Sequence, residues 1–364
     1  IRDRRKVLLQ APKNGFFYVI DRETGDLISA EPYVQTTWAT HVDPETGRPV
    51  EVEGMRYKEG PALVMPAPYG GHNWHPMAYS PDTGLIYIPA QDIPFAYGTD
   101  ANFEFTPGVW NVGVNPLFAS FAEQPPEAQA QLMKMVTGQI IAWDPVQRKE
   151  VWRVRHPLPW NGGMLATAGN LVFQGNSVGE FAAYTADNGE KLWSMGAQTG
   201  IVASPVTYEV DGEQYVTVLA GWGGSLALSG GDIAAATGVR NISRVLTFKL
   251  GSSGALPPVE TPTLIANPPP RVDDPEAIAR GKQHYANRCM VCHGFDAISP
   301  GMAPDLRASA LLGSAEAFAD VVRDGSRQRN GMPAYRHLTD EQLLKIRHYV
   351  RGEAQRALQT AGSE

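Results

Sequence analysis

The chain lacks several features that define common classes of protein. No stretch of about 20 apolar residues occurs in its 364 residues, so no membrane span is expected. Positive charge is not in excess, because 31 Lys and Arg residues stand against 38 Asp and Glu. The resulting formal charge of −7 argues against a nucleic-acid partner. The first residues, IRDRRK, contain neither an initiator methionine nor a signal peptide.

Cysteine is also scarce, and the two that occur stand in one motif. Cys289 and Cys292 precede His293 in the sequence CMVCH, which has the spacing of a c-type haem attachment site. Each thiol can bond to one vinyl group of a haem, and the histidine then reaches the iron as proximal ligand. Two buried or disulfide-forming cysteines beside a chance histidine are the alternative, which the flanking sequence disfavours. Because such haem attachment takes place outside the cytoplasm, we expect a periplasmic protein, processed or a fragment.

The flanks of this motif predict a small helical domain. Residues 277–287 and 315–323 have helical patterns, and a third helix is expected over 338–351. The third begins with Thr339, Asp340 and Glu341, a typical helix start. Together they predict an all-α cytochrome c domain of class I type over residues 276–364.

Iron needs a sixth ligand, and a methionine thioether favours electron transfer and raises the potential. Met332 stands in a Gly-Met-Pro turn of a loop that can reach the far haem face. Met302 follows His293 too closely to reach that side easily, so we predict Met332. Either methionine could instead fill a gap in the core. Three histidines compete, and we interpret them as surface or helix-face residues: His284, His337 and His348.

A Pro-, Gly- and Ser-rich segment separates the haem motif from the rest of the chain. The strand-like run VLTFK at 245–249 gives way to residues 251–275, which include three successive prolines at 268–270. This composition is typical of a semi-extended linker rather than a long ordered loop of one domain. We therefore expect a first domain over 1–250, a linker over 251–275, and the cytochrome domain.

Residues 1–250 carry internal repeats. The segment AWDPVQRKEVW at 142–152 aligns with AYTADNGEKLW at 183–193, and the Ala and Trp positions match at an offset of 41 residues. VIDRETG at 19–25 is a weaker copy, and YSPDTG at 79–84 has a related turn. A period near 40 residues with short strands is typical of a β-propeller, in which the tryptophans pack between blades. Chance similarity of turns is the alternative.

A propeller followed by a cytochrome resembles one family closely. The quinohaemoprotein (type II) alcohol dehydrogenases carry pyrroloquinoline quinone (PQQ) in an eight-bladed propeller. The resemblance covers essentially the whole chain, and its motifs are QAPKNGFF at 10–17, GHNWHPM at 71–77, WNGG at 160–163 with ATAGNLVF at 166–173, and AGWGG at 220–224. It implies a mainly β chain that forms part of such a propeller, followed by the small all-α cytochrome domain.

The resemblance assigns roles to individual residues. Those that match quinone-contacting positions are Lys13, Asn73, Trp74, Trp160, Gly221 and Trp222. Lys13 corresponds to the cation beside the quinone oxygens, where a fixed positive charge stabilises the developing negative charge. The loop after Trp160 differs in length from that of methanol dehydrogenases. His72 and His75 could suggest a metal pair, but without a third ligand we interpret them as structural.

The chain also departs from the family pattern. At about 40–50 residues per blade, 250 residues make only about half of eight blades. The other half supplies the family's calcium ligands, most contacts to the PQQ carboxylates, the ring-stacking tryptophan and the paired cysteines. The aspartate base should precede Lys13, and Asp3 is too close to fill that role. We therefore expect a fragment, because an unclosed propeller would expose strand edges.

The resemblance implies a function for the complete enzyme. An alcohol is oxidised to an aldehyde or ketone by PQQ beside calcium, and electrons pass to the haem c. They then go to a soluble periplasmic acceptor, such as a blue copper protein or cytochrome c. One alternative is another substrate of the same chemistry, such as polyvinyl alcohol, a cyclic alcohol or a hydroxylated alkaloid. The other is an electron-transfer cytochrome with a non-catalytic propeller.

Overall fold

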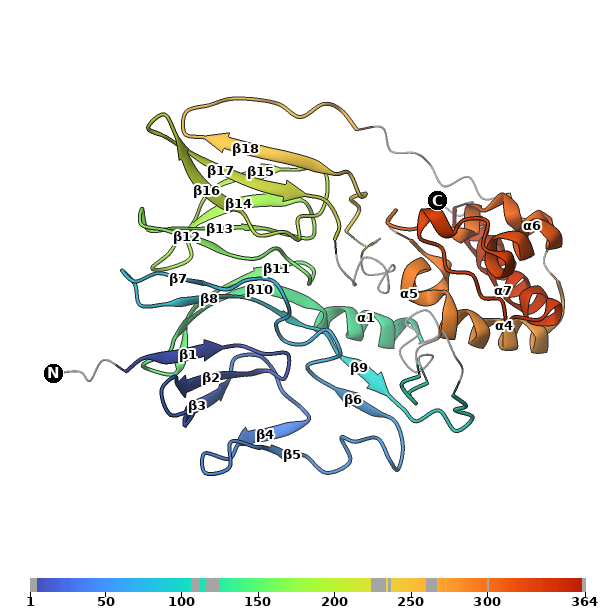
Figure 1. The fold of residues 1–364 in the computed structure, drawn as a ribbon, viewed down its shortest axis with the longest axis horizontal. Coiled ribbons are helices and arrows are strands. Elements are labelled where there is room, and N and C mark those ends of the chain that lie inside the picture. The colour runs from blue at the N-terminus through green and yellow to red at the C-terminus, as the bar shows by residue number, and fades with distance from the viewer. Residues whose placement is uncertain are drawn as a thin grey trace. The chain divides into compact units, whose positions relative to one another are not determined.

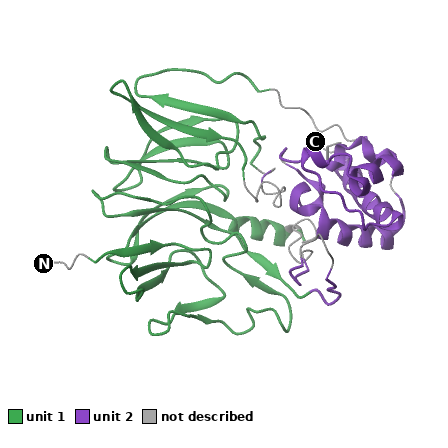
Figure 2. Ribbon diagram, in the orientation of Figure 1, with its two compact units in different colours: residues 1–99, 123–223, 237–259 green, residues 100–122, 224–236, 260–364 purple. Residues whose placement is uncertain are grey.

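The computed structural model describes residues 5–105, 111–115, 125–223, 234, 237–259, 267–270, 272–299 and 301–361. The chain divides into two compact units (Figure 2). The first comprises residues 1–99, 123–223 and 237–259, and the second comprises 100–122, 224–236 and 260–364. The first is mainly β-structure and the second contains most of the helices (Figure 1). In the described part of the chain we find no helix with the length and hydrophobicity of a membrane span.

Antiparallel sheets of three or four strands make up the first unit. The first sheet contains β1 (Val7–Gln10), β2 (Phe16–Asp21) and β3 (Leu27–Pro32). The second contains β7 (Ala78–Tyr79), β8 (Ile86–Asp92), β10 (Thr137–Asp144) and β11 (Lys149–His156). The third contains β12 (Leu165–Thr167), β13 (Leu171–Gly175), β14 (Glu180–Thr185) and β15 (Lys191–Gly196). The fourth contains β16 (Val206–Val210), β17 (Glu213–Ala220) and β18 (Arg244–Lys249).

Smaller elements lie between these strands in the sequence. Two strand pairs are β4 (Ala39–Val42) with β5 (Pro49–Glu51), and β6 (Ala62–Val64) with β9 (Phe95–Tyr97). The helix α1 (Pro126–Met135) precedes β10, and the sequence patterns did not predict it.

The internal repeats correspond to equivalent hairpins. Ala142 pairs with Trp152 in β10–β11, and Ala183 pairs with Trp193 in β14–β15. The register shifts by a bulge directly after Ala142 and directly after Ala183, and β2–β3 has a bulge at the corresponding point after Val19. A shared bulge gives the hairpins the same local twist. The predicted repeat is therefore confirmed as a repeated three-dimensional unit.

Each sheet packs on the next sheet in chain order. Phe17 of the first sheet shares a core with Trp143 of the second, at 5.6 Å between ring centroids. Trp152 of the second sheet packs in a core with Val172 and Tyr184 of the third. Its indole N–H donates to the carbonyl of Ala186 at 3.1 Å. Tryptophans thus pack between neighbouring sheets as expected for propeller blades, and the described sheets form an open array.

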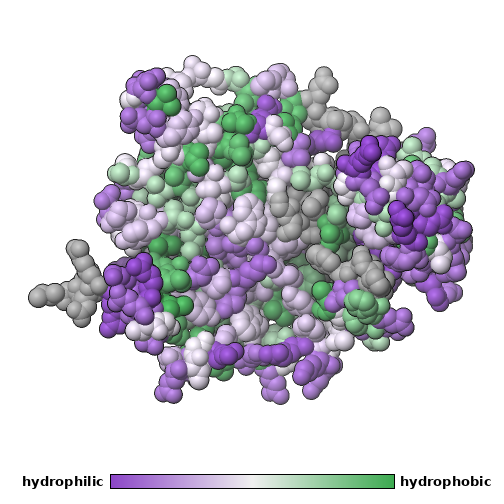
Figure 3. Space-filling model, in the orientation of Figure 1, coloured by the Kyte–Doolittle hydropathy of each residue, from purple (hydrophilic) through white to green (hydrophobic). Residues whose placement is uncertain are grey.

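The fourth sheet has one packed face and one exposed face. Val216, Val218 and Leu246 pack on the third sheet. On the opposite face, Leu219 pairs with Val245, and their side chains are 58% and 70% exposed. Apolar residues also reach the surface elsewhere in Figure 3. An apolar sheet face of this kind is where a further sheet would pack in a longer array.

The described part of the second unit is mainly helical. Its helices are α4 (Pro275–Arg288), α5 (Met290–His293), α6 (Ala315–Ala319) and α7 (Asp340–Ala361). Single helical turns connect them: η3 (Phe295–Ala297), η4 (Leu306–Ala308), η5 (Ala310–Gly313), the π-helical η6 (Asp320–Asp324) and η7 (Gln328–Asn330). The three predicted helices are present, although α4 begins within the expected linker and α7 extends ten residues further than predicted.

Capping and close packing fix the two longest helices. Asp274 accepts a hydrogen bond from the Ala277 backbone N–H at 2.9 Å, at the start of α4. Thr339 and Gln342 form a reciprocal capping box at the start of α7. The helices cross at Gly281, where a Cβ atom would collide with the Lys345 carbonyl oxygen. A glycine is therefore required at this crossing.

A buried charged cluster lies beside this crossing. The Glu353 carboxylate is 3.0 Å from the Arg356 guanidinium, and Asp296 accepts a hydrogen bond from the Tyr349 hydroxyl at 3.1 Å. Lys282 lies 3.6 Å from Asp296. Burial raises the pKa of Glu353 to about 7, and the Asp296 charge adds to this shift while Arg356 opposes it.

A glycine pair tests the packing of one sheet on the next. Gly189 has a left-handed φ of +75°, and a Cβ atom there would lie 2.6 Å from the Trp152 ring. Gly47 occupies an equivalent turn with φ +68° and has open space around it. We expect Gly47→Ala to cost about 1 kcal/mol of unfolding free energy through backbone strain alone. Gly189→Ala should cost about 1–3 kcal/mol more. Denaturant titrations giving equal losses would contradict this packing.

Glu353 predicts a pH-dependent stability. Its pKa is raised in the folded state, so its stabilising contribution is present below about pH 4.5. That contribution is lost as the pH rises through about 7. Relative to Glu353→Gln, the wild type should lose up to roughly 3 kcal/mol over this range. Urea titrations followed by helical circular dichroism measure the loss. The exposed Glu316→Gln control should behave as wild type, and a pH-independent difference would refute the assignment.

Candidate functional site

The loop that contains Lys13 is held against a second loop of the first unit. Residues 11–15 connect β1 to β2, and the Lys13 carbonyl accepts a hydrogen bond from the Gly71 N–H at 3.0 Å. The Lys13 ammonium donates to the carbonyl of Pro68 at 3.0 Å. At Gly70, which has φ +79°, a Cβ atom would lie 2.7 Å from the Cα of Lys13. Glycine therefore allows the two backbones to approach closely.

His72 connects the same two loops. Its Nδ1 lies 2.6 Å from the Ala11 carbonyl oxygen, and its Nε2 lies 2.6 Å from that of His75. Burial lowers the pKa of His72, while these two hydrogen bonds act in the opposite direction. Both ring nitrogens are used within the protein, so the placement of His72 supports the structural interpretation.

A cluster of rings surrounds the 73–75 segment. The Asn73 amide donates to the Tyr69 carbonyl at 2.7 Å, and its oxygen accepts from the Trp74 N–H. Trp74 is 54% exposed and stacks on the His75 ring at 4.3 Å. The His75 ring in turn contacts the buried Trp160 edge-on at 4.8 Å. Burial, with the neighbouring His72, lowers the pKa of His75 to about 3, so its ring is neutral at neutral pH.

Trp74 also lines a groove of about 440 Å³ with Gly221 and Trp222. The other lining residues come from the segment before β16, from the end of β17 and just after it, and from the start of β18 and just before it: Val202, Ala203, Leu219, Ala220, Gly223, Ser243, Arg244 and Val245. Trp222 fits here because Gly200 has no side chain, since a Cβ atom would lie 2.7 Å from the indole. The backbone N–H of Trp222 donates to the Asn241 amide oxygen at 2.9 Å.

Three ring nitrogens in this region are buried without a hydrogen-bond partner among the described residues. They are the indole nitrogens of Trp160 and Trp222 and the Nε2 of His75. A buried polar group without a partner costs free energy, and a bound polar ligand removes that cost. An aromatic groove with unpartnered donors nearby fits a planar ligand that carries several oxygen atoms.

The structure places three of the six quinone-site candidates in the groove and connects the other three to it through neighbouring residues. Trp74, Gly221 and Trp222 line the groove directly, and Asn73 precedes Trp74. Tyr69 links the others, because its ring contacts Trp160 at 5.3 Å and its loop binds Lys13 through Pro68. The sequence patterns did not reveal Arg244, because no local signal marks a residue that enters the groove from β18.

The haem-attachment residues lie on consecutive turns of the second unit. Cys289 ends α4, and its carbonyl accepts hydrogen bonds from the N–H groups of Cys292 and His293. Both cysteines are free thiols. His293 is buried, and its Nδ1 donates to the Pro304 carbonyl at 3.0 Å. That bond fixes the tautomer that leaves Nε2 for a metal. Burial lowers the pKa of His293, which keeps the ring neutral.

Met332 lies in a loop anchored to the same region. Tyr335 donates its N–H to the Val322 carbonyl at 2.8 Å and its hydroxyl to the Arg288 carbonyl at 2.6 Å. Met332 packs on the core that contains Cys289, whereas Met302 is not part of that core. This placement supports Met332 over Met302 as the sixth ligand. Of the competing histidines, His337 is exposed, and His284 and His348 are partly buried.

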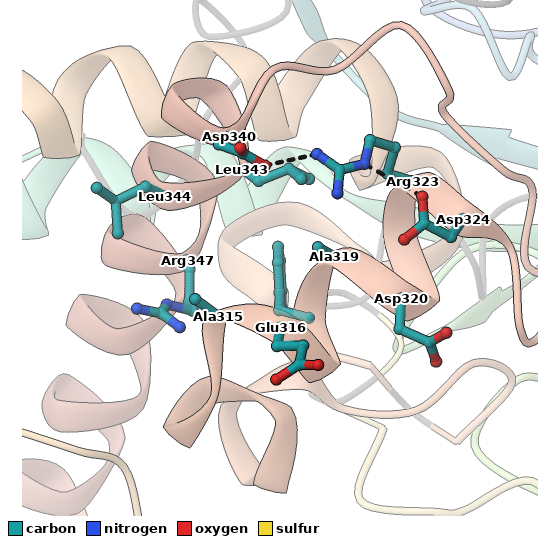
Figure 4. A pocket seen from close by; sticks show the side chains of 11 residues that line it. Ala315, Glu316, Ala319, Asp320, Arg323, Asp324, Asp340, Leu343, Leu344 and Arg347 are labelled. Atoms are coloured by element: carbon teal, nitrogen blue, oxygen red, sulfur yellow. Dashed lines mark hydrogen bonds and ion pairs between the residues drawn. The ribbon is translucent and has the colours of Figure 1, made fainter.

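A second hollow, of about 350 Å³, lies between α6 with η6 and the first half of α7 (Figure 4). Arg323 forms ion pairs with Asp324 and Asp340 at one end of it. Its lining residues are Ala315, Glu316, Phe318, Ala319, Asp320, Arg323, Asp324, Asp340, Leu343, Leu344 and Arg347. These do not include the haem-attachment residues, so we do not assign the haem to this hollow.

Comparison with known proteins finds matches for both parts of the chain. A family model described as the β-propeller domain of glucose/ethanol/alcohol dehydrogenase (PQQ) matches residues 45–216. A second, described as cytochrome c oxidase, cbb3-type, subunit III, matches residues 276–350. Quinohemoprotein alcohol dehydrogenase ADH IIB of Pseudomonas putida is 46% identical over 349 residues, which are 95% of this chain and 49% of that protein.

Solved structures give the same result. Quinohemoprotein alcohol dehydrogenase ADHIIG of Pseudomonas putida HK5 superposes with a TM-score of 0.88 at 40% identity, covering 98% of this chain and 52% of that chain. The enzyme of Comamonas testosteroni superposes with a TM-score of 0.79 at 36% identity, covering 96% and 51%. The chain spans about half the length of these relatives. It is related to the quinohaemoprotein alcohol dehydrogenases over nearly its whole length, which confirms the resemblance carried by its motifs.

Proposed function

We propose that this chain provides the haem-bearing half of a PQQ-dependent quinohaemoprotein alcohol dehydrogenase. Residues 1–250 form the C-terminal half of an eight-bladed propeller, residues 251–275 are the linker, and residues 276–364 are the cytochrome c domain. The observation that carries this proposal is the groove between Trp74 and Trp222, together with a haem-attachment motif in the same chain. The complete protein oxidises alcohols to aldehydes or ketones in the periplasm.

The chain's own residues supply binding and orientation at the quinone site. PQQ, when bound, supplies the two-electron oxidation of the alcohol. Trp74 and Trp222 provide ring surfaces for a planar cofactor, and Gly221 lets the backbone approach it. Lys13 provides a positive charge for the quinone oxygens, and its tie to Pro68 holds the side chain next to the Asn73 loop. Trp160 supports this loop through its contact with His75.

The residues of the second unit fit a c-type haem. Cys289 and Cys292 would bond to its vinyl groups, and His293 would bind the iron through the nitrogen that its hydrogen bond to Pro304 leaves available. Met332 would supply the second protein ligand of the iron. A His–Met pair favours outer-sphere electron transfer over oxygen chemistry. The bound group would supply one-electron transfer to a soluble acceptor, either a blue copper protein or a cytochrome c.

Two components of the reaction are assigned to the other half of the propeller. The aspartate base and the calcium ligands have no assigned residues in this chain. The exposed face of the fourth sheet extends beyond the groove to Val206 and Tyr208, and that part suits packing against a further blade. In the alternative, the propeller is non-catalytic and only docks partners. This alternative stands because no base is assigned among the described residues.

A reconstitution experiment separates these two functions. We expect haem reduction when the haem-loaded chain is combined anaerobically with PQQ, calcium, a primary alcohol and a polypeptide corresponding to the other half of the Pseudomonas putida relative. Lys13→Ala should abolish this reduction, because it removes the charge beside the quinone oxygens. Lys6→Ala, which changes an exposed lysine paired with Glu23, is the matched control.

The outcome is read from the haem absorption bands. Reduction that requires both PQQ and alcohol supports the dehydrogenase. If the two halves form a stable complex and only dithionite reduces the haem, the electron-transfer function is correct instead. Failure of the halves to associate would contradict the proposed propeller closure. A panel that includes cyclic alcohols and polyvinyl alcohol identifies the substrate class.

The sixth ligand is tested separately. Met332→Ala should abolish the methionine–iron charge-transfer absorption of the oxidised haem. It should also lower the midpoint potential by more than about 60 mV, a tenfold change in a one-electron equilibrium constant. Met302→Ala is the matched control and should change neither quantity. Loss of the absorption band in Met302→Ala alone would assign the ligand to Met302.

A further inference from the structure

Arg244 stands out among the described residues that line the groove, because it is the one charged side chain there. It is the first residue of β18 and pairs with Ala220 at the end of β17. The walls near it are apolar or aromatic, and they include Trp222, Leu219 and Val202. A single cation in an apolar groove creates a strong local preference for an anion.

The hydrogen bonds of Arg244 leave part of its guanidinium unused. One terminal nitrogen, Nη2, donates to the Gln198 amide oxygen at 2.6 Å. The Nε atom is buried, and in the described part of the chain it has no hydrogen-bond partner. No carboxylate in that part pairs with Arg244. A partly buried cation without an anion is costly, and the cost is removed when a carboxylate binds.

Gln198 holds this arrangement in place. Its backbone has a left-handed φ of +63°, which is uncommon for a residue with a side chain. The residue precedes Thr199 and Gly200, and Gly200 is the position that makes room for the Trp222 ring. One backbone segment therefore positions both the amide that binds Arg244 and the aromatic wall of the groove.

We infer that Arg244 binds a carboxylate of the planar quinone cofactor between Trp74 and Trp222. This inference rests on the proposed function and adds a residue to its cofactor site. PQQ is a planar aromatic tricarboxylate, so an indole-lined groove with one guanidinium matches both its ring and its charge. Arginine suits this role because its planar group presents several N–H donors to a carboxylate.

The test is a binding measurement that does not depend on turnover. The complex of the full chain with the polypeptide that supplies the other half is titrated with PQQ, and quenching of tryptophan fluorescence gives the dissociation constant. Arg244→Gln should weaken binding about 10- to 100-fold, the range expected for a lost charge-assisted hydrogen bond. Arg244→Lys keeps the charge without the planar donors, so it should weaken PQQ binding less than Arg244→Gln does. Arg22→Gln is the control, because it removes an exposed positive charge of the same unit.

A neutral form of the cofactor isolates the carboxylate contact. PQQ triester has no carboxylate charge, so Arg244→Gln should leave its affinity unchanged. If wild type binds PQQ and Arg244→Gln binds it equally well, the inference is wrong and the proposed function stands. If Arg244→Gln lowers thermal stability but leaves the ratio of the affinities for PQQ and its triester unchanged, Arg244 is structural and the inference fails. If the complex of the two halves forms and its wild type does not bind PQQ, the proposed function itself is contradicted.

Discussion

The close approach of two loops at Gly70 and Gly71 is the constraint on which the candidate quinone site depends. At Gly70 the backbone of Lys13 leaves no space for a side chain, and at Gly71 the side chain of Val34 does the same. This contact brings the end of the first sheet to the segment that carries Asn73 and Trp74. His72 then connects both loops through two backbone carbonyls. The site residues are thus placed by backbone packing.

The array of sheets explains why a site can form here at all. Each sheet presents an aromatic or apolar face to the next, so loops from different sheets meet at one end. The groove takes Trp74 from the loop before β7, Gly221 and Trp222 from the end of β17, and Arg244 from β18. These residues are far apart in the sequence and meet because the sheets stack in chain order.

Local patterns predicted the parts of the structure that depend on short sequence spacing. Three features could be recognised from short motifs or fixed spacings in the sequence. They are the CMVCH motif, the capping residues of α7 and the 41-residue repeat. The turn at Asp43 was missed. Its carboxylate accepts hydrogen bonds from the N–H groups of Glu45 and Thr46, and the Asp21 carboxylate makes the same contacts with Glu23 and Thr24 in the predicted repeat. The strands on either side of the Asp43 turn, β4 and β5, are short and carry no tryptophan. Arg244 and Gly200 were also missed, because their importance comes from contacts between distant segments.

The anchoring of Tyr335 has a consequence for the kinetics of electron transfer. Its two hydrogen bonds, to Val322 of η6 and to Arg288 at the end of α4, fix the loop of Met332 to both helices. With Met332 as the proposed iron ligand, a loop held in this way would limit the movement of the thioether when the iron changes its oxidation state. The nuclear reorganisation energy of each electron transfer would then be small, which would favour fast electron exchange even at low driving force.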